Sequence, residues 1–140
     1  MNRKQTFTQF IALSSEVNQL SIDLCRGSEH QFTTCQYNLL KYLKFNQPVA
    51  VSEICDYLKI SLPNASRELK KLQEQDLIQK NPSREDRRKV YINLSEKGDR
   101  LVTDYFTALE TQFLDRIKGI SEDDIEEINQ ALAVLLSKLF

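Results

Sequence analysis

The hydrophobic pattern of this chain changes its period after Leu77 and Ile78. Before that point apolar residues recur at steps of three and four, which is the period of a helix. The stretches Gln79–Pro82 and Val90–Leu94 lack this spacing, and in the second of them every other side chain is aliphatic, which predicts two strands. Steps of four return from Leu101 onward. We therefore expect a mainly α fold with one small β-hairpin.

Four helices are expected before the hairpin. The first covers about residues 8–26, and the second about residues 34–46 with Thr33 or Thr34 as its cap. A short third helix starts at Ser52, and a fourth follows almost at once, with a proline in its first turn. Two short helices joined so tightly form a helix-turn-helix.

Two further helices are expected after the hairpin, so that the element order is α-α-α-α-β-β-α-α. The fifth helix covers about twenty residues that end near Ile117, and the sixth runs from its cap Ser121 to the C-terminus. The first helix and these two carry apolar stripes. Such stripes can fold back on the domain or be buried against a second copy, and we expect the second arrangement, a homodimer.

The length of 140 residues, with only three Gly and three Pro, is typical of a single globular domain. No apolar run approaches the roughly 18 residues of a membrane span. The segment Met1–Lys4 is followed by polar residues and not by the apolar part of a secretion signal. We therefore expect a cytoplasmic protein that makes no membrane contact.

Charge is distributed unevenly, although the formal net charge is only −1. Residues 59–100 carry eleven Lys and Arg against seven Asp and Glu, whereas residues 101–140 carry three against eight. This asymmetry is expected if the middle of the chain binds a polyanion. The alternative is ordinary variation in surface charge.

The outward face of the fourth helix is the first candidate for such binding. An α-helix fits the major groove of double-stranded DNA, where Arg binds guanine, Asn binds adenine, and Ser and Lys reach phosphates. A solvated helix face is the alternative, but the preceding short helix favours the DNA-binding interpretation. The candidate residues are Asn64, Ser66, Arg67, Lys70 and Lys71.

The turn of the hairpin, residues 83–89, is the second candidate. Arginines on a projecting loop can enter a narrow minor groove, whose negative potential attracts them. We expect Asp86 to pair with Arg88 and stiffen the loop; a merely solvated turn is the alternative. One duplex can contact both surfaces only if they face the same way. The candidate residues are Arg84, Asp86, Arg87 and Arg88.

Three segments, Ser61–Leu72, Asp76–Ile78 and Ser83–Gly98, together resemble the winged helix-turn-helix of the MarR family of bacterial transcriptional regulators. The Asp-Arg-Arg of the turn, followed by Leu-Ser-Glu-Lys-Gly, is the specific part of this resemblance. Motif similarity is strong over about residues 33–100, while helix order and chain length match the family over nearly the whole sequence.

The resemblance implies one MarR-like domain over residues 1–140, with a winged-helix DNA-binding lobe at 33–100 and dimerisation helices at 1–30 and 101–140. It implies a homodimer whose recognition helices enter successive major grooves and whose wings enter the flanking minor grooves. Such a protein binds a palindromic promoter site, usually as a repressor, and a small-molecule effector releases it.

Carried over by position, the resemblance assigns reading and wing roles to six of the candidates: Asn64, Ser66, Arg67, Asp86, Arg87 and Arg88. The chain departs from the family at two positions. Asp76 stands where the family usually has a Gly after the recognition helix, so it must adopt a strained or altered conformation. Lys80 replaces an Arg that is common at the start of the wing.

Three cysteines without a CxxC pair argue against a disulfide framework and a zinc site. Cys55 is expected to be a small core residue. A redox role for Cys25 or Cys35 requires a lowered pKa and access to oxidant. The lone His30, next to Glu29, does not predict a metal site, and no cofactor is expected.

By analogy with the family, three aromatic residues are candidates for a small-molecule pocket. They are Phe32, Tyr37 and Tyr105. The alternative is that these side chains belong to the hydrophobic core.

The leading hypothesis is a homodimeric, DNA-binding transcriptional regulator. We assign no catalytic residue and expect no enzyme, because the sequence contains no HExxH, Walker loop, nucleophile elbow or paired Cys/His arrangement. Two alternatives are a winged-helix module that binds an acidic protein and a regulator that senses oxidants through a cysteine.

Overall fold

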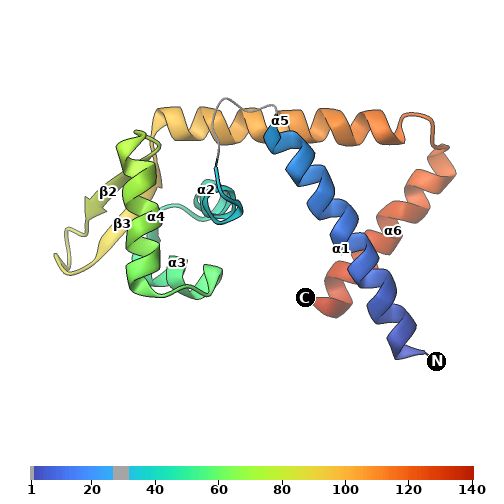
Figure 1. Cartoon of the computed structure of the whole chain (residues 1–140), viewed down its shortest axis with the longest axis horizontal. Helices are drawn as coiled ribbons and strands as arrows, with labels where there is room; N and C mark the ends of the chain where they lie inside the picture. The colour runs from blue at the N-terminus through green and yellow to red at the C-terminus, as the bar shows by residue number, and fades with distance from the viewer. Residues whose placement is uncertain (1, 27–31) are drawn as a thin grey trace. The chain divides into compact units, whose positions relative to one another are not determined.

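The computed structural model describes residues 2–26 and 32–140, with the backbone alone for residues 24–26. The chain forms two compact units, Met1–Phe106 and Thr107–Phe140. The elements found in the described residues (Figure 1) are α1 (Arg3–Arg26), α2 (Thr34–Asn46), β1 (Val49–Ala50), α3 (Val51–Leu58), α4 (Leu62–Glu74), β2 (Ile78–Pro82), β3 (Val90–Leu94), α5 (Glu96–Ile117) and α6 (Glu122–Leu139). The expected mainly helical fold with a small antiparallel sheet is confirmed.

Helix α1 begins five residues earlier than the apolar spacing predicts, at Arg3 and not at Thr8. The side chain of Asn2 explains the difference, because its Oδ1 accepts hydrogen bonds from the backbone N–H groups of Lys4 at 3.1 Å and Gln5 at 3.3 Å. Asn is among the preferred N-cap residues, so the helix extends to this cap although its first turn has no apolar stripe.

Helix α2 begins after a capping box, which identifies Thr33 and not Thr34 as the cap. The Thr33 hydroxyl accepts from the Gln36 N–H at 3.1 Å, and the Gln36 side chain accepts from the Thr33 N–H at 3.0 Å. Each side chain thereby satisfies one of the backbone donors that a helix start leaves without an intrahelical partner.

The helix-turn-helix is present, but its first helix starts one residue earlier than expected. Helix α3 begins at Val51 and not at Ser52, and the Glu53 carboxylate accepts from the N–H of Ala50. Lys59 ends α3 in the left-handed conformation, with φ at 55°. This tight end lets Ser61 cap α4 only two residues later, through the N–H of Asn64.

The sheet has three antiparallel strands in the order β1-β3-β2, whereas the sequence pattern predicts two. Strand β1 contains only Val49 and Ala50, which pair with Ile92 and Tyr91 of β3. Two residues are too few to show an alternating pattern, and their partner strand lies about forty positions later. The expectation of a lone hairpin is therefore wrong in this respect.

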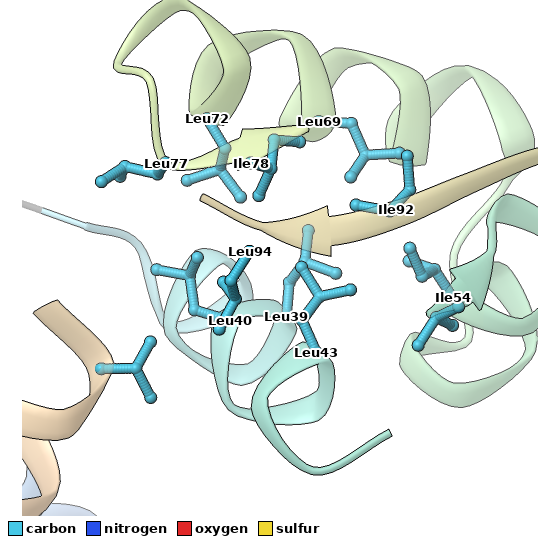
Figure 2. Packing of buried hydrophobic residues seen from close by; sticks show 12 residues of the cluster. Leu39, Leu40, Leu43, Ile54, Leu69, Leu72, Leu77, Ile78, Ile92 and Leu94 are labelled. Carbon is cyan, nitrogen blue, oxygen red and sulfur yellow. The ribbon is translucent and has the colours of Figure 1, made fainter. Parts of the chain in front are cut away.

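The core lies between the helices and the sheet of the first unit (Figure 2). Leu39, Leu40 and Leu43 of α2 point toward β3 from one side, and Leu69 and Leu72 of α4 approach it from the other. The remaining members come from β1, α3, the residue before β2, β2 itself, β3 and the first turns of α5: Val49, Ile54, Leu77, Ile78, Ile92, Leu94 and Val102. This packing decides which side of α4 faces solvent.

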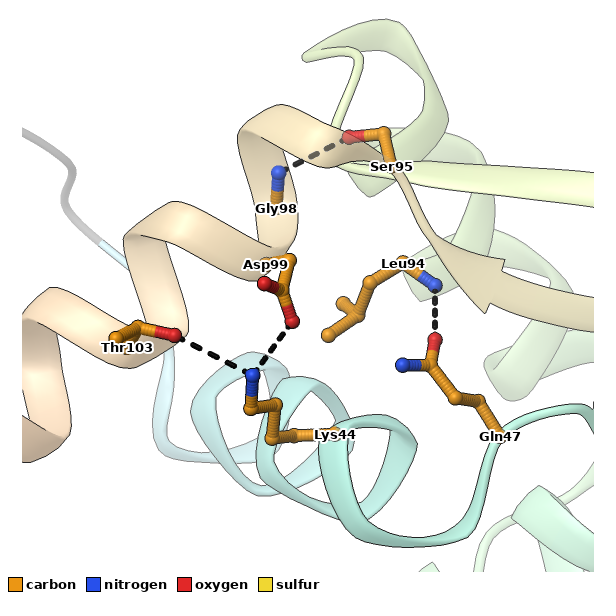
Figure 3. Close-up of polar contacts among 7 residues, drawn as sticks. All are labelled: Lys44, Gln47, Leu94, Ser95, Gly98, Asp99 and Thr103. Atoms are coloured by element: carbon orange, nitrogen blue, oxygen red, sulfur yellow. Dashed lines mark hydrogen bonds and ion pairs between the residues drawn. The ribbon is translucent and has the colours of Figure 1, made fainter.

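Polar contacts attach the first turns of α5 to the core (Figure 3). The Lys44 ammonium of α2 lies 2.6 Å from Oδ1 of Asp99 and donates to Thr103 at 3.3 Å. Ser95 caps α5, because its Oγ accepts from the Gly98 N–H at 3.0 Å. The start of α5 is therefore held in a defined position next to the winged helix.

The second unit contains the end of α5 and all of α6. Ser121 caps α6 through the N–H of Asp124, as expected, and carboxylates occupy its first turn, where they interact favourably with the helix dipole. No residue of α6 is buried in the described structure. None of the helices in residues 2–26 and 32–140 has the length and hydropathy needed to cross a bilayer.

Asp76 adopts the left-handed backbone that its position predicts, with φ at 59°. Its carbonyl accepts from the Ser95 hydroxyl, which holds the turn between α4 and β2. We expect Asp76→Val to lower the free energy of unfolding by about 1–2 kcal/mol, because a β-branched side chain is strained at this φ. Asp76→Gly should leave it unchanged or raise it by up to about 1 kcal/mol. Urea midpoints at constant m-value measure both, and a Val variant as stable as the parent would contradict the strain argument.

Candidate nucleic-acid interface

The outward face of α4 is set by what its inner face buries. Ala65, Leu69 and Leu72 are buried, and a turn of about 100° per residue places Arg67 and Lys70 roughly opposite them. All five candidates on this helix are exposed: Asn64, Ser66, Arg67, Lys70 and Lys71. The apolar spacing therefore predicts the orientation of α4 correctly.

The loop between β2 and β3 is ordered by its own backbone. The N–H of Ser83 donates to the carbonyl of Lys89 at 2.8 Å, and the N–H of Lys89 donates to the carbonyl of Asp86 at 3.0 Å. The Ser83 hydroxyl accepts from the N–H groups of Glu85 and Asp86. These bonds hold residues 83–89, here called the wing loop, in a defined turn.

The expected pairing of the Asp86 carboxylate with the Arg88 side chain is wrong, because the carboxylate bonds the backbone of Arg88. Oδ1 of Asp86 accepts from the backbone N–H of Arg88 at 3.0 Å, so the carboxylate shapes the turn and does not bind the guanidinium. Among the described residues, the ion pairs are Lys44–Asp99, Lys71–Glu68 and Lys118–Asp115. The exposed arginines of the wing loop are in none of them, and their charge is not neutralised by a carboxylate of the lobe.

Helix α4 and the hairpin are adjacent parts of the same unit. Strand β2 follows α4 after a short turn and contacts it, and Figure 1 shows the hairpin alongside the helix. The first unit thus carries two neighbouring basic surfaces, one on a helix and one on a loop. A helix of major-groove size next to an arginine-bearing loop is the combination that base reading and minor-groove contact require.

A cavity of about 450 Å³ lies in the same unit, between α1, α2 and the middle of α5. The three aromatic candidates all line it. Tyr37 and Tyr105 are stacked with ring centroids 5.0 Å apart, and Phe32 meets Tyr37 edge-on at 5.1 Å. The structure thus brings Tyr105 together with Phe32 and Tyr37, which lie about seventy positions earlier in the sequence.

The sequence interpretation does not include most of the lining of this cavity. The other residues that line it are Ser14, Val17, Asn18, Ser21, Ile22, Thr34, Asn38 and Lys41. A signal for part of this set was present, because Ser14, Asn18 and Ser21 recur at steps of four and three and so form a polar stripe on one face of α1. A polar stripe on one face of a helix is usually solvated, so this spacing alone does not predict a cavity.

Cys35 differs from an activated thiol. Burial and, to a smaller extent, the nearby Glu68 carboxylate raise the pKa of the Cys35 thiol, which disfavours the reactive thiolate. Cys55 is half-buried, and both thiols are free. The side chain of Cys25 and the whole of His30 and Glu29 lie outside the described residues.

Comparison with known proteins adds an independent line of evidence. The sequence model of the MarR family matches residues 30–89. The chain is 30% identical over 105 residues to YdgG of Bacillus subtilis, an uncharacterised HTH-type transcriptional regulator, and the alignment covers 74% of this chain and 69% of YdgG.

Solved structures share the fold. A MarR family protein from Bacillus stearothermophilus has a TM-score of 0.86 and 15% sequence identity to this chain, over 99% of this chain and 98% of that one. FabT of Streptococcus pneumoniae, solved in complex with DNA, has a TM-score of 0.78 and 22% identity, over 97% and 96% of the two chains.

Proposed function

Because this chain belongs to the MarR family of transcriptional regulators, we propose that it is a homodimeric, sequence-specific DNA-binding regulator that represses from a palindromic promoter site. The observation that carries this proposal is the pair of neighbouring surfaces on α4 and the wing loop, whose arginines are exposed and outside the ion pairs of the lobe. Arg67 and Asn64 would read base edges, and Arg84, Arg87 and Arg88 would contact the flanking minor groove and phosphates.

Exposed apolar side chains support the dimer. Helix α1 exposes Phe7 and Val17, and α6 exposes Val134, Leu136 and Leu139 while burying none of its residues. Apolar patches of this kind are usually covered by another protein surface. We assign these contacts to a second copy, with DNA binding in residues 33–100 and dimerisation in residues 1–30 and 101–140.

The cavity supports a small-molecule effector that releases the protein from DNA. Its stacked tyrosines offer an aromatic surface, and Asn38 and Lys41 of α2 supply polar groups, as is typical of small-molecule sites. The raised pKa of Cys35 counts against the alternative of oxidant sensing at that residue. The proposed regulator is cytoplasmic and has no catalytic role.

Sequencing of DNA fragments that the purified protein selects from a random pool tests this function. A homodimer should enrich a palindrome whose half-sites lie about 10–10.5 base pairs apart, centre to centre. The same selection with Arg67→Ala should relax the preference at one position in each half-site, and binding to the parent site should weaken about tenfold. Arg88→Ala should weaken binding with less effect on sequence choice.

Two outcomes would contradict the proposal. Unchanged affinity of both variants in a gel-shift titration would remove α4 and the wing loop from the interface. A lack of enrichment, together with an affinity for random duplex that does not fall as salt is added, would favour the alternative module that binds an acidic protein, because phosphate contacts weaken steeply with salt.

A further inference from the structure

Gln36 is a polar side chain in the interior of the first unit. Gln36 is 5% exposed, and among the described residues it is the one polar residue that is buried. Burying an amide costs free energy unless it finds hydrogen-bond partners, so a buried Gln is expected to connect other groups.

The hydrogen bonds of Gln36 join the start of α2 to the recognition helix. Its Oε1 accepts from the N–H of Thr33, and its Nε2 donates to Oε2 of Glu68 on α4 at 3.0 Å. Glu68 is itself only 19% exposed, and its Oε1 lies 3.7 Å from the ammonium of Lys71. One chain of contacts therefore runs from the first turn of α2 through Glu68 to a basic side chain on the outward face.

The hydrogen bond between Gln36 and Glu68 constrains α4 in a different way from its apolar packing. The buried Ala65, Leu69 and Leu72 hold the helix against the core, but apolar contacts are non-directional and tolerate a small rotation or slide. A hydrogen bond to a partly buried carboxylate is directional, and it is stronger than one in water. Within the orientation that the apolar packing gives, the contact therefore restricts small rotations of α4 about its axis.

The position of Gln36 in α2 adds a second connection. Its neighbours Thr34 and Tyr37 both line the cavity, while Gln36 itself points toward α4. The same helical turn thus contacts the cavity on one side and the recognition helix on the other.

We propose that Gln36 is a positioning residue for DNA reading, which acts through Glu68 to set the orientation of α4 and the place of Lys71 against the duplex. This inference rests on the proposed function. It predicts that Gln36 affects the choice between sites more than it affects attraction to DNA in general, because the exposed charges of α4 and the wing loop are unaltered.

An exchange of the two side chains tests this inference. Gln36→Glu keeps the capping box, since Glu suits the third helical position, but it places two carboxylates against each other. We expect about tenfold weaker binding to the selected palindrome and a smaller change with random duplex, because the orientation of α4 changes while the exposed basic groups that bind phosphates are all kept. In Gln36→Glu/Glu68→Gln the hydrogen bond is restored with its direction reversed, and the ratio of specific to random affinity should return to within about threefold of the parent.

Fluorescence anisotropy at one salt concentration gives both affinities, and urea unfolding of each variant identifies any loss of folded protein. If Gln36→Glu fails to fold, Gln36→Met takes its place. It removes the bonds to Glu68 and to the Thr33 N–H without adding charge, and it should also lower the ratio of specific to random affinity. A ratio that stays within twofold of the parent in the folded single variant, or that does not recover in the exchanged pair, overturns the inference while leaving the proposed function in place. A parent protein without any site preference overturns the proposed function and the inference with it.

Discussion

Replacing Arg84, Arg87 and Arg88 together with glutamine is expected to weaken binding to duplex DNA by roughly 100-fold at a fixed salt concentration near physiological. The three side chains are exposed, and the backbone bonds of the wing loop do not depend on them. Glutamine keeps the length and polarity of the side chain but removes the charge that binds phosphates and the minor groove. The fold should therefore persist while the affinity falls.

The salt dependence of DNA binding shows whether lost phosphate contacts cause the loss of affinity. Each lost phosphate contact should reduce the slope of log affinity against log salt by about 0.9, so the slope should fall by up to about 2.7 for the triple variant. The chain offers a matched control, because residues 107–140 also contain three exposed basic side chains: Arg116, Lys118 and Lys138. Replacing those with glutamine changes the net charge equally. An equal loss of affinity in both triple variants would mean that total charge, and not the wing loop, controls binding.

Replacing Gly98 with alanine is expected to lower the free energy of unfolding by about 2–4 kcal/mol. A Cβ at this position would clash with the carbonyl oxygen of Leu77 and would lie 2.9 Å from its carbonyl carbon. Neither group can move freely, because Leu77 is fully buried and its carbonyl accepts from the N–H of Ser95 at 3.0 Å. Relief of the clash must displace backbone on both sides.

The sign of the change in the free energy of unfolding distinguishes the effect of this clash from the effect of helix propensity. Gly98 lies in the first turn of α5, where alanine alone would favour the helix by up to about 1 kcal/mol. Gly119 is the control, since a Cβ there meets nothing within 4 Å and its φ is not positive. Gly119→Ala should change stability by less than about 0.5 kcal/mol. Urea midpoints measure both variants, and a Gly98→Ala protein as stable as the parent would show that α5 does not require this close approach.

Gly98 also connects to the recognition helix. The Lys97 ammonium donates to the carbonyl of Gln75 at 3.1 Å, and Ser95 bonds the carbonyl of Asp76. The end of α4 and the start of α5 are therefore held together, and we expect a shift at Gly98 to displace the turn that ends α4.

Local features were predictable from the sequence. Ser61 and Ser121 cap their helices as expected, and Ala65, Leu69 and Leu72 form the buried side of α4. These features depend on groups within about four residues of one another, so their signal is contained in a short window. The left-handed backbone of Asp76 was expected only from the resemblance to the MarR family, in which a Gly usually occupies this position.

Other features needed partners from distant parts of the chain. Strand β1 exists because β3 supplies its hydrogen bonds, and neither of its two residues carries a pattern. The contact between Asp86 and Arg88 is local by contrast, but the sequence does not distinguish the guanidinium, which we expect as the partner, from the backbone N–H that Asp86 bonds in the structure.

The residues of the candidate interface can thus be predicted from the sequence, because a basic face needs only helical spacing and exposed charge. How these residues lie relative to one another cannot be predicted in this way. The close approach at Gly98, the cavity around Tyr37 and Tyr105, and the bond from Gln36 to Glu68 each join residues more than twenty positions apart. Such contacts form only after the core has brought the helices and the sheet together, since their geometry depends on packing that no single segment encodes.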